Sequence, residues 1–229
     1  MSPGPTPWLR RIGQVVLVVA AMDALLFGAA GRLDWLAAWM LSLAYLAFLL
    51  VVVVWATRNA PDLLEERSRM AANVKTWDKV VGAIYTSLVL ALLITAGLDA
   101  GRFRWSAMPI EVQALGAIGL APAGAAIMWS MTSNAFLSRW ARIQDDRGHV
   151  VVEAGPYRFV RHPMYAGIML LMICVSLALG SWYALVPAGL VCALYIVRTA
   201  LEDRMLQDEL PGYREYARRV RYRLVPRLW

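Results

Sequence analysis

Long apolar runs are the feature of this sequence that most constrains its fold. A membrane-crossing helix needs about 20 consecutive apolar residues to span a hydrocarbon core about 30 Å thick. Six runs close to that length occupy residues 12–30, 35–56, 80–98, 110–131, 164–179 and 182–197. Of the 229 residues, 60% are apolar and 17% are charged, against about 45–50% and about 25% in soluble proteins. We therefore predict an all-α, polytopic transmembrane bundle with about six membrane segments.

The last two runs are expected to form a tight helical hairpin over residues 164–197. Only Gly180 and Ser181 separate them. A helix of about 16 residues extends about 24 Å, which is marginal for a complete crossing. The length alone leaves open whether this hairpin crosses the whole membrane.

Basic residues are concentrated on one side of this map. With both termini on the same side, that side carries 20 of the 23 Lys and Arg residues and the other side carries three. Cytoplasmic loops are enriched in Lys and Arg, so we expect both termini in the cytoplasm. The net charge of +7 then reflects topology and attraction to anionic lipid, and we expect no nucleic-acid partner. Arg outnumbers Lys 21 to 2, which favours a GC-rich bacterial genome and so the bacterial inner membrane.

The chain is expected to divide into a four-span body, residues 1–131, and a C-terminal unit, residues 132–229. That unit contains a cytoplasmic loop, the hairpin and an amphipathic tail. The tail has a helical apolar pattern that Pro211 and Gly212 interrupt. We expect a helix that continues out of the last span, a break, and a second helix ending before Pro226. A separate short surface helix is expected to begin at Pro61.

Polar and aromatic residues are densest between Gly155 and Gly167, in the sequence GPYRFVRHPMYAG. Pro163 is well placed at the first position of a membrane helix. The start of that helix, with Arg158, Arg161 and His162 nearby, is suited to bind an anion. Tyr157 and Tyr165 offer flat faces for a purine or a cation. The alternative is an interfacial belt that anchors the helix in the membrane.

A second polar cluster begins with Glu202 and Asp203, five residues beyond the last apolar run, and includes Tyr213 and Tyr216. Carboxylates at that depth are costly unless they pair or bind a ligand. The alternative to a binding role is pairing with Arg198, one turn earlier, or with Arg158 and Arg161.

These two clusters resemble the isoprenylcysteine carboxyl methyltransferase family and its phospholipid-methylating relatives. The shared signature is Gly-x-Tyr followed by Arg-His-Pro-x-Tyr-x-Gly, then a hairpin, an acidic pair and a Tyr-x-x-Tyr tail. The resemblance covers roughly residues 134–229. The family's acidic pair is Glu-Glu, whereas Glu202 and Asp203 stand here, so the second carboxylate is shorter by one methylene.

The resemblance implies a methyltransferase that uses S-adenosylmethionine, with the cytoplasmic loop and tail forming the cofactor site. The cofactor residues that it implies are Tyr157, His162, Pro163, Tyr165, Gly167, Glu202, Tyr213 and Tyr216. The expected catalytic or acceptor-orienting residues are Arg158, Arg161, Glu202 and Asp203, with Arg204 a further candidate for orienting an anionic acceptor. The expected acceptor is a lipid or a small apolar molecule that carries a carboxylate, an amine or a thiol.

Other interpretations stay open at this point. A lipid- or sterol-type reductase that binds NADPH has a related C-terminal unit, and a membrane scaffold needs no cofactor. The oligomeric state is not indicated. Asp145, Asp146 and His149 make a thin case for a metal, so we expect none, and we expect His149 to lie in a surface turn. Asp23 lies inside the first run, where we expect it to pair or to make a polar contact between helices.

Overall fold

The computed structural model describes residues 7–68 and 74–229, and every regular element in these ranges is helical. The long helices are α1 (Pro7–Ala30), α2 (Leu36–Asn59), α4 (Thr76–Ala96), α5 (Ile110–Ser133), α6 (Pro163–Ala178) and α7 (Leu185–Glu209). The short elements are α3 (Pro61–Ser68), the π-helix η1 (Gly97–Phe103), the 3-10 turns η2 (Asp145–Arg147) and η3 (Gly155–Arg158), and α8 (Tyr213–Arg219). The all-α prediction is confirmed.

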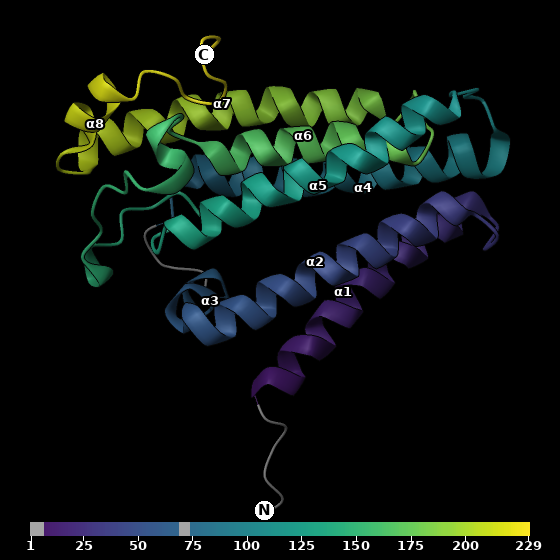
Figure 1. Cartoon of the computed structure of the whole chain (residues 1–229), viewed down its shortest axis with the longest axis horizontal. Helices are drawn as coiled ribbons and strands as arrows, with labels where there is room; N and C mark the ends of the chain where they lie inside the picture. The colour runs from purple at the N-terminus through teal and green to yellow at the C-terminus, as the bar shows by residue number, and fades with distance from the viewer. Residues whose placement is uncertain (1–6, 69–73) are drawn as a thin grey trace, which may run out of the picture.

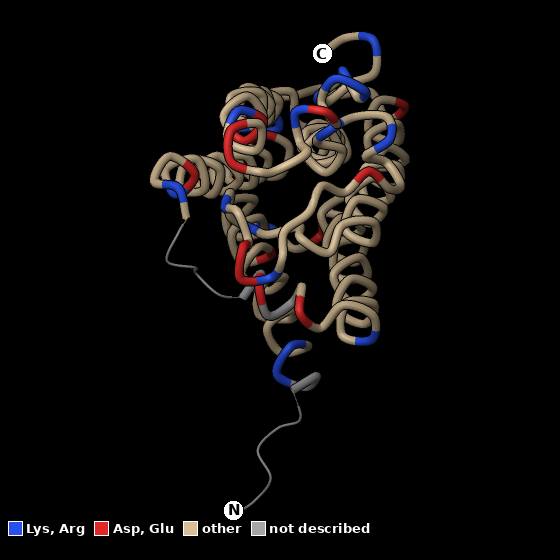
Figure 2. Tube along the Cα trace, turned by 90° about the vertical axis from the view of Figure 1, so that its left-hand side faces the viewer, with Lys and Arg blue, Asp and Glu red and all other residues tan. Residues whose placement is uncertain are grey.

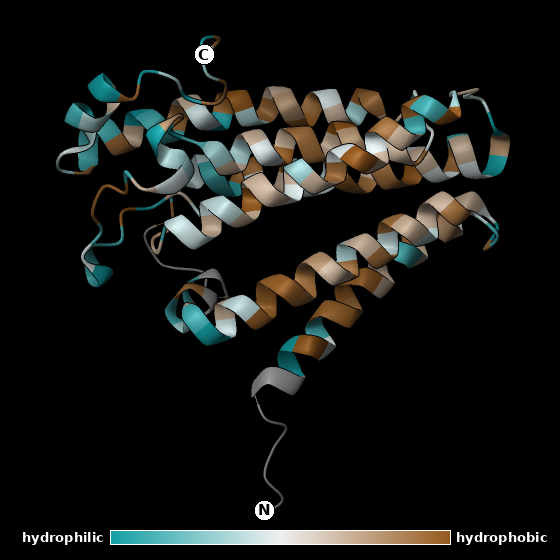
Figure 3. Ribbon diagram, in the orientation of Figure 1, coloured by the Kyte–Doolittle hydropathy of each residue, from teal (hydrophilic) through white to brown (hydrophobic). Residues whose placement is uncertain are grey.

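Five of these helices are long and apolar enough to cross a membrane: α1, α2, α4 with η1, α5 and α7. The sixth, α6, is equally apolar but has only 16 residues. Figure 3 shows that the middle of the bundle is mostly hydrophobic and that hydrophilic residues gather at its ends. These features fit an integral membrane protein with about six segments, as the apolar runs predicted.

The helices form two groups in space (Figure 1). One group is the pair α1 and α2, and the other is the bundle of α4, α5, α6 and α7. Within the bundle α5 packs closely on α6 because glycines let their backbones approach. A Cβ on Gly116 would stand 2.5 Å from the Ala178 nitrogen, and one on Gly167 would stand 2.9 Å from the Ile127 side chain. Small residues have this effect at helix contacts in membranes.

The α1–α2 pair meets the bundle at one end and diverges from it toward the other (Figure 1). At the meeting end, a Cβ on Gly97 would stand 2.7 Å from Ala29, so the backbones of η1 and α1 lie in close contact. The divergence leaves an apolar cavity of about 670 Å³ lined by α1, α2, α4, α5 and α6. Between α1 and α2, Ser42 donates a hydrogen bond to Asp23, which confirms the expected polar contact between helices.

The opposite end of the bundle, here called the loop end, consists of residues 134–162, α8 (Tyr213–Arg219) and the start of α6. Figure 2 looks onto this end and shows acidic and basic residues gathered around it. As expected, α7 continues beyond the apolar run to Glu209, the chain breaks around Pro211, and α8 ends at Arg219, before Pro226. The surface helix α3 begins at Pro61, as expected, while residues 69–73 of the same connection lie outside the described residues. The division of the chain at residue 131 stays a prediction.

Candidate functional site

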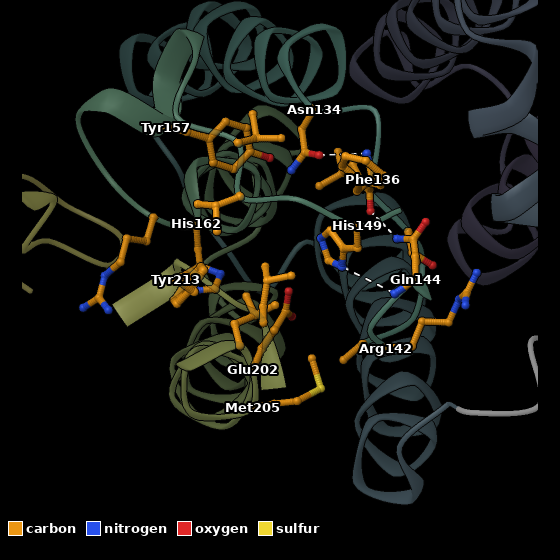
Figure 4. Close-up of a pocket in the computed structure, with 18 of the residues that line it drawn as sticks. Asn134, Phe136, Arg142, Gln144, His149, Tyr157, His162, Glu202, Met205 and Tyr213 are labelled. Carbon is orange, nitrogen blue, oxygen red and sulfur yellow. Dashed lines mark hydrogen bonds between the residues drawn. The ribbon is translucent and has the colours of Figure 1, made fainter. Parts of the chain in front are cut away.

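A polar cavity of about 90 Å³ opens at the loop end, between three parts of the C-terminal unit. Figure 4 shows side chains from the 134–152 segment, from the residues around the start of α6, and from α7 and α8 converging on it. The predicted site residues that line it are Tyr157, Arg161, His162, Tyr165, Glu202, Tyr213 and Tyr216. The first and last of them, Tyr157 and Tyr216, are 59 positions apart in the sequence, so the fold brings both polar clusters to one place.

The residues before α6 are held by the C-terminal tail. The main-chain nitrogens of Arg161 and His162 donate hydrogen bonds to the carbonyl oxygens of Tyr222 and Arg223 at 3.0 and 2.8 Å. Pro163 then begins α6, where its missing N–H is not needed. The tail therefore fixes the direction in which the helix start and its flanking side chains face the cavity.

Tyr165 and Glu202 form one wall of the cavity. The Tyr165 hydroxyl donates a hydrogen bond to Glu202 Oε2, and the His162 ring stacks on the Tyr165 ring with centroids 5.6 Å apart. Arg198 Nε lies 4.0 Å from the same Glu202 oxygen, as the pairing alternative expected. The Glu202 side chain is 20% exposed and lines the cavity, so its second oxygen is able to accept hydrogen bonds from a ligand.

Asp203 lies behind the cavity and does not line it. The carboxylate is fully buried and accepts hydrogen bonds from Arg161 Nη1 at 2.7 Å and from Arg223 Nε at 3.0 Å. Gln207 Nε2 and the Tyr213 hydroxyl also donate to it, at 2.9 and 3.1 Å. The pairing of the acidic cluster with Arg161 is therefore confirmed, and Asp203 acts as an anchor that joins α6, α7, α8 and the tail.

The tyrosines of the tail present their rings to the cavity, while their hydroxyls are used for structural contacts. The Tyr216 hydroxyl donates to the carbonyl oxygen of Tyr157 at 2.8 Å. Tyr213 and Tyr216 meet edge to face at 5.4 Å. Burial raises the pKa of both phenols, so they are neutral and serve as aromatic surfaces rather than as acids or bases.

Besides Asp203, three predicted site residues stand apart from the cavity. The Arg158 side chain is exposed to solvent and does not line it. Gly167 faces α5, where it allows close helix packing, and Pro163 is buried at the start of α6. Arg204, the further candidate for orienting an acceptor, is exposed on α7 outside this cavity.

The 134–152 segment supplies the outer wall of the cavity, which the sequence did not indicate in detail. Gln144 Nε2 donates to the carbonyl oxygen of Phe136 at 2.5 Å. Arg142 binds Glu66 on α3, with Nη2 2.7 Å from Oε2, and this ion pair lowers the pKa of Glu66. The expectation that His149 lies in a surface turn is only partly correct, because its ring is half-buried against Phe136 at 4.8 Å and lines the cavity.

Two of the helices that line the cavity, α6 and α7, belong to the part of the chain that matches a known protein family. Residues 112–210 match the phospholipid methyltransferase family. The match runs from α5 to the end of α7 and includes the start of α6, Tyr165 and Glu202. It confirms the resemblance of the C-terminal part to integral membrane methyltransferases.

The chain is also similar to a curated protein, the cobalt-zinc-cadmium resistance protein CzcN of Cupriavidus metallidurans. It is 30% identical over 144 residues. The alignment covers 58% of this chain and 58% of the relative, so the chain spans less than two thirds of that protein's length. Within residues 7–68 and 74–229, no group of three or more His, Cys, Asp or Glu side chains is placed to hold a metal ion.

Proposed function

We propose that this protein is a membrane-embedded methyltransferase that uses S-adenosylmethionine and acts on a lipidic or small apolar acceptor. The observation that carries the proposal is the cavity at the loop end, which Tyr157, His162, Tyr165 and Glu202 line together. The match of residues 112–210 to phospholipid methyltransferases supports the reaction class.

The side chains around the cavity fit the chemistry of this cofactor. Glu202 is able to accept hydrogen bonds from a ribose diol or an α-ammonium group, because its carboxylate is exposed to the cavity. His162 and the start of α6 suit an α-carboxylate. The rings of Tyr157 and Tyr216, which also line the cavity, suit an adenine or a sulfonium cation.

The cavity must enlarge to admit a molecule of the size of S-adenosylmethionine. At about 90 Å³ it is smaller than the roughly 300–1,000 Å³ of typical small-molecule sites. The α6 and α7 walls are fixed by buried ion pairs, and the Arg142–Glu66 pair holds the first part of the 134–152 segment against α3. Residues 145–152 have no regular secondary structure apart from η2. We therefore propose that residues 145–152 move outward when the cofactor enters and close over it afterwards.

S-adenosylmethionine, when bound, supplies an activated methyl group on a sulfonium. The contribution of this chain is to bind, orient and exclude water, since in-line methyl transfer to an anionic nucleophile needs little proton transfer. If the acceptor is an amine, Glu202 is the group placed to take its proton, because Asp203 is buried in ion pairs. Arg158 and Arg204 are exposed and are able to orient an anionic acceptor, whereas Arg161 is bound to Asp203.

The apolar cavity between the α1–α2 pair and the bundle supports an acceptor with a hydrophobic chain, since its lining residues are almost all apolar. We further propose that the loop end faces the cytoplasm and that the protein resides in a bacterial inner membrane. The 20 basic residues assigned to that side support this orientation.

Transfer of a radiolabelled methyl group from S-adenosylmethionine tests this function in membranes that contain the protein. The proposal expects label in the lipid extract with the wild type and a loss of about 100-fold or more with Glu202→Gln. Label that does not exceed that of membranes without the protein would contradict it. Saturable binding of NADPH in the same preparation would favour the reductase alternative, and binding of neither cofactor would favour a scaffold.

A further inference from the structure

Arg198 is a buried cation on α7, one helical turn before Glu202. Its side chain is 10% exposed and does not line the polar cavity. The Arg198 Nη2 atom lies 3.0 Å from Asp78 Oδ1 on α4 and donates to the carbonyl oxygen of Arg139 at 3.1 Å. Asp78 is fully buried and also accepts a hydrogen bond from the Ala141 nitrogen at 2.7 Å. This ion pair therefore joins α4, α7 and the 134–152 segment.

Stability alone is a weak reason for an ion pair in this position. Removing two charges from water costs free energy that their attraction often fails to return, and apolar residues of similar volume are frequently as stable. Asp78 and Arg198 lie within two residues of an apolar run and are both buried, and charged residues at that depth are often functional. The contacts of the Arg198 guanidinium with residues of the cavity wall indicate such a function.

The guanidinium reaches both members of the Tyr165–Glu202 pair. Arg198 Cζ lies 5.1 Å from the centroid of the Tyr165 ring, in a cation–π contact, and Arg198 Nε lies 4.0 Å from Glu202 Oε2. Among the described residues, no acceptor is aligned for a hydrogen bond with that Nε. Glu202 therefore has two donors within reach, the Tyr165 hydroxyl that it binds now and the Arg198 Nε that a small movement of the carboxylate would engage.

We propose that the Asp78–Arg198 ion pair is a positioning device for the cofactor site: it fixes the location of the Glu202 carboxylate and the Tyr165 ring at the cavity wall. The identity of the ligand in this inference rests on the proposed function. The contacts among Asp78, Arg198, Glu202 and Tyr165 do not depend on it. In a region of low dielectric constant, the attraction between the guanidinium and the carboxylate is strong. The planar guanidinium also supports the aromatic face in a way that an ammonium group cannot.

The test removes the whole ion pair so that no buried charge is left alone. The double variant Asp78→Asn, Arg198→Met keeps an acceptor for the Ala141 nitrogen and keeps most of the side-chain volume. Its matched control is Lys75→Met, Glu209→Gln, because Lys75 and Glu209 also join the start of α4 to the end of α7, at 2.7 Å, but are about 34% and 43% exposed. Affinity for S-adenosylhomocysteine and the thermal midpoint without ligand are measured for each.

The proposal expects the double variant to remain folded and to bind S-adenosylhomocysteine about 10-fold or more weakly, which corresponds to about 1.4 kcal/mol, with no change in the control. The single variant Arg198→Lys, which keeps the charge but not the planar guanidinium, should bind S-adenosylhomocysteine more tightly than the double variant and more weakly than the wild type. In a Glu202→Gln background the double substitution should cause a smaller further loss than in the wild type, since part of its effect passes through Glu202. Wild-type affinity in the folded double variant, or a fully additive loss in that background, would overturn the proposal.

A measurement without cofactor keeps this inference separate from the proposed function. Fluorotyrosine at position 165 reports the ring environment by ¹⁹F NMR. The proposal expects the control to match the wild type in chemical shift and linewidth, and the double variant to give a narrower resonance closer to the shift of free fluorotyrosine, since a ring without a fixed orientation averages its environments. A double variant with the wild-type shift and linewidth would overturn the positioning role. Failure of the wild type to bind S-adenosylhomocysteine would instead contradict the proposed function.

Discussion

The hydroxyl of Tyr165 on α6 donates a hydrogen bond to the carboxylate of Glu202 on α7. The two residues are 37 positions apart and lie on the two helices of the hairpin. The hairpin thus does more than insert into the membrane, because it brings the Arg-His-Pro-x-Tyr element and the acidic pair to the same cavity wall.

This contact predicts an effect of Tyr165→Phe on cofactor binding. A hydrogen bond to a charged group contributes about 1.5–3 kcal/mol. Without it Glu202 is free to leave the orientation that binds a ligand, so affinity for S-adenosylhomocysteine should fall by about 10-fold or more while the ring remains in place. Tyr183→Phe is the control, because Tyr183 is 54% exposed near the opposite end of the bundle. Equal affinity of the two variants in calorimetric titration would contradict a role for the Tyr165 hydroxyl.

The buried anchor predicts a large effect of Asp203→Asn on stability. Asp203 neutralises Arg161 and Arg223, and loss of one partner of a buried pair costs about 3–5 kcal/mol. Thermal unfolding in detergent should show a midpoint several degrees lower. Asp208→Asn on the same helix breaks an exposed pair with Arg214, which contributes at most about 1 kcal/mol, so a similar change in both variants would show that Asp203 is not an anchor.

Close packing of α5 on α6 predicts different outcomes for two Gly→Ala substitutions. A Cβ on Gly116 would stand 2.5 Å from the Ala178 nitrogen, so the α6 backbone must shift, at a cost of about 1–3 kcal/mol. A Cβ on Gly189 meets nothing within 4 Å, and Ala there should be neutral or stabilising by up to about 1 kcal/mol. Thermal midpoints measure both, and tolerance of Ala at position 116 would argue against this helix contact.

The half-buried His149 predicts a pH dependence of the 134–152 segment. Burial, and then the nearby Arg142 guanidinium, lowers the pKa of His149 below its ordinary value of 6.5. A lowered pKa means that the folded segment favours the neutral imidazole. This contribution is complete above the ordinary pKa and is lost as the pH falls through the lowered value. The neutral ring is also needed for Nδ1 to accept from the Gln144 nitrogen at 3.4 Å.

Hydrogen exchange of residues 134–152 measures this dependence. After correction for the intrinsic rate, exchange should increase between about pH 8 and about pH 5, the range in which histidine titrates. His149→Gln should exchange with little dependence on pH. A wild-type segment whose corrected exchange is the same at both ends of the range would contradict the prediction.

Local features of the sequence were sufficient to predict the helices. Apolar runs set the six membrane segments, and Pro61, Pro163 and Pro211 marked where helices begin or end, because proline acts on its own neighbours. The resemblance in the C-terminal part also identified seven of the residues that line the cavity, but not those of the 134–152 segment. Both polar clusters were found because polar residues so close to apolar runs are unusual.

Tertiary contacts determined what the sequence could not show. Arg158 and Arg161 have the same residue type and similar positions, yet one is exposed and the other is paired with Asp203. That difference depends on how the tail packs against residues 161–162. The contribution of Asp78 was likewise not visible, because its partner Arg198 is 120 positions away. The position of the Asp78 carboxylate, two residues before an apolar run, was the one feature of the sequence that could have indicated this contact.

Calorimetric titration with S-adenosylhomocysteine tests the central claim most directly. The detergent-purified wild type is compared with His162→Ala, Glu202→Ala and the exposed control Arg214→Ala. The account predicts a Kd of about 1 μM, or −8.2 kcal/mol, for the wild type and the control, with binding lost in the two cavity variants. A folded wild-type protein that does not bind S-adenosylhomocysteine, or cavity variants that bind it normally, would contradict the account.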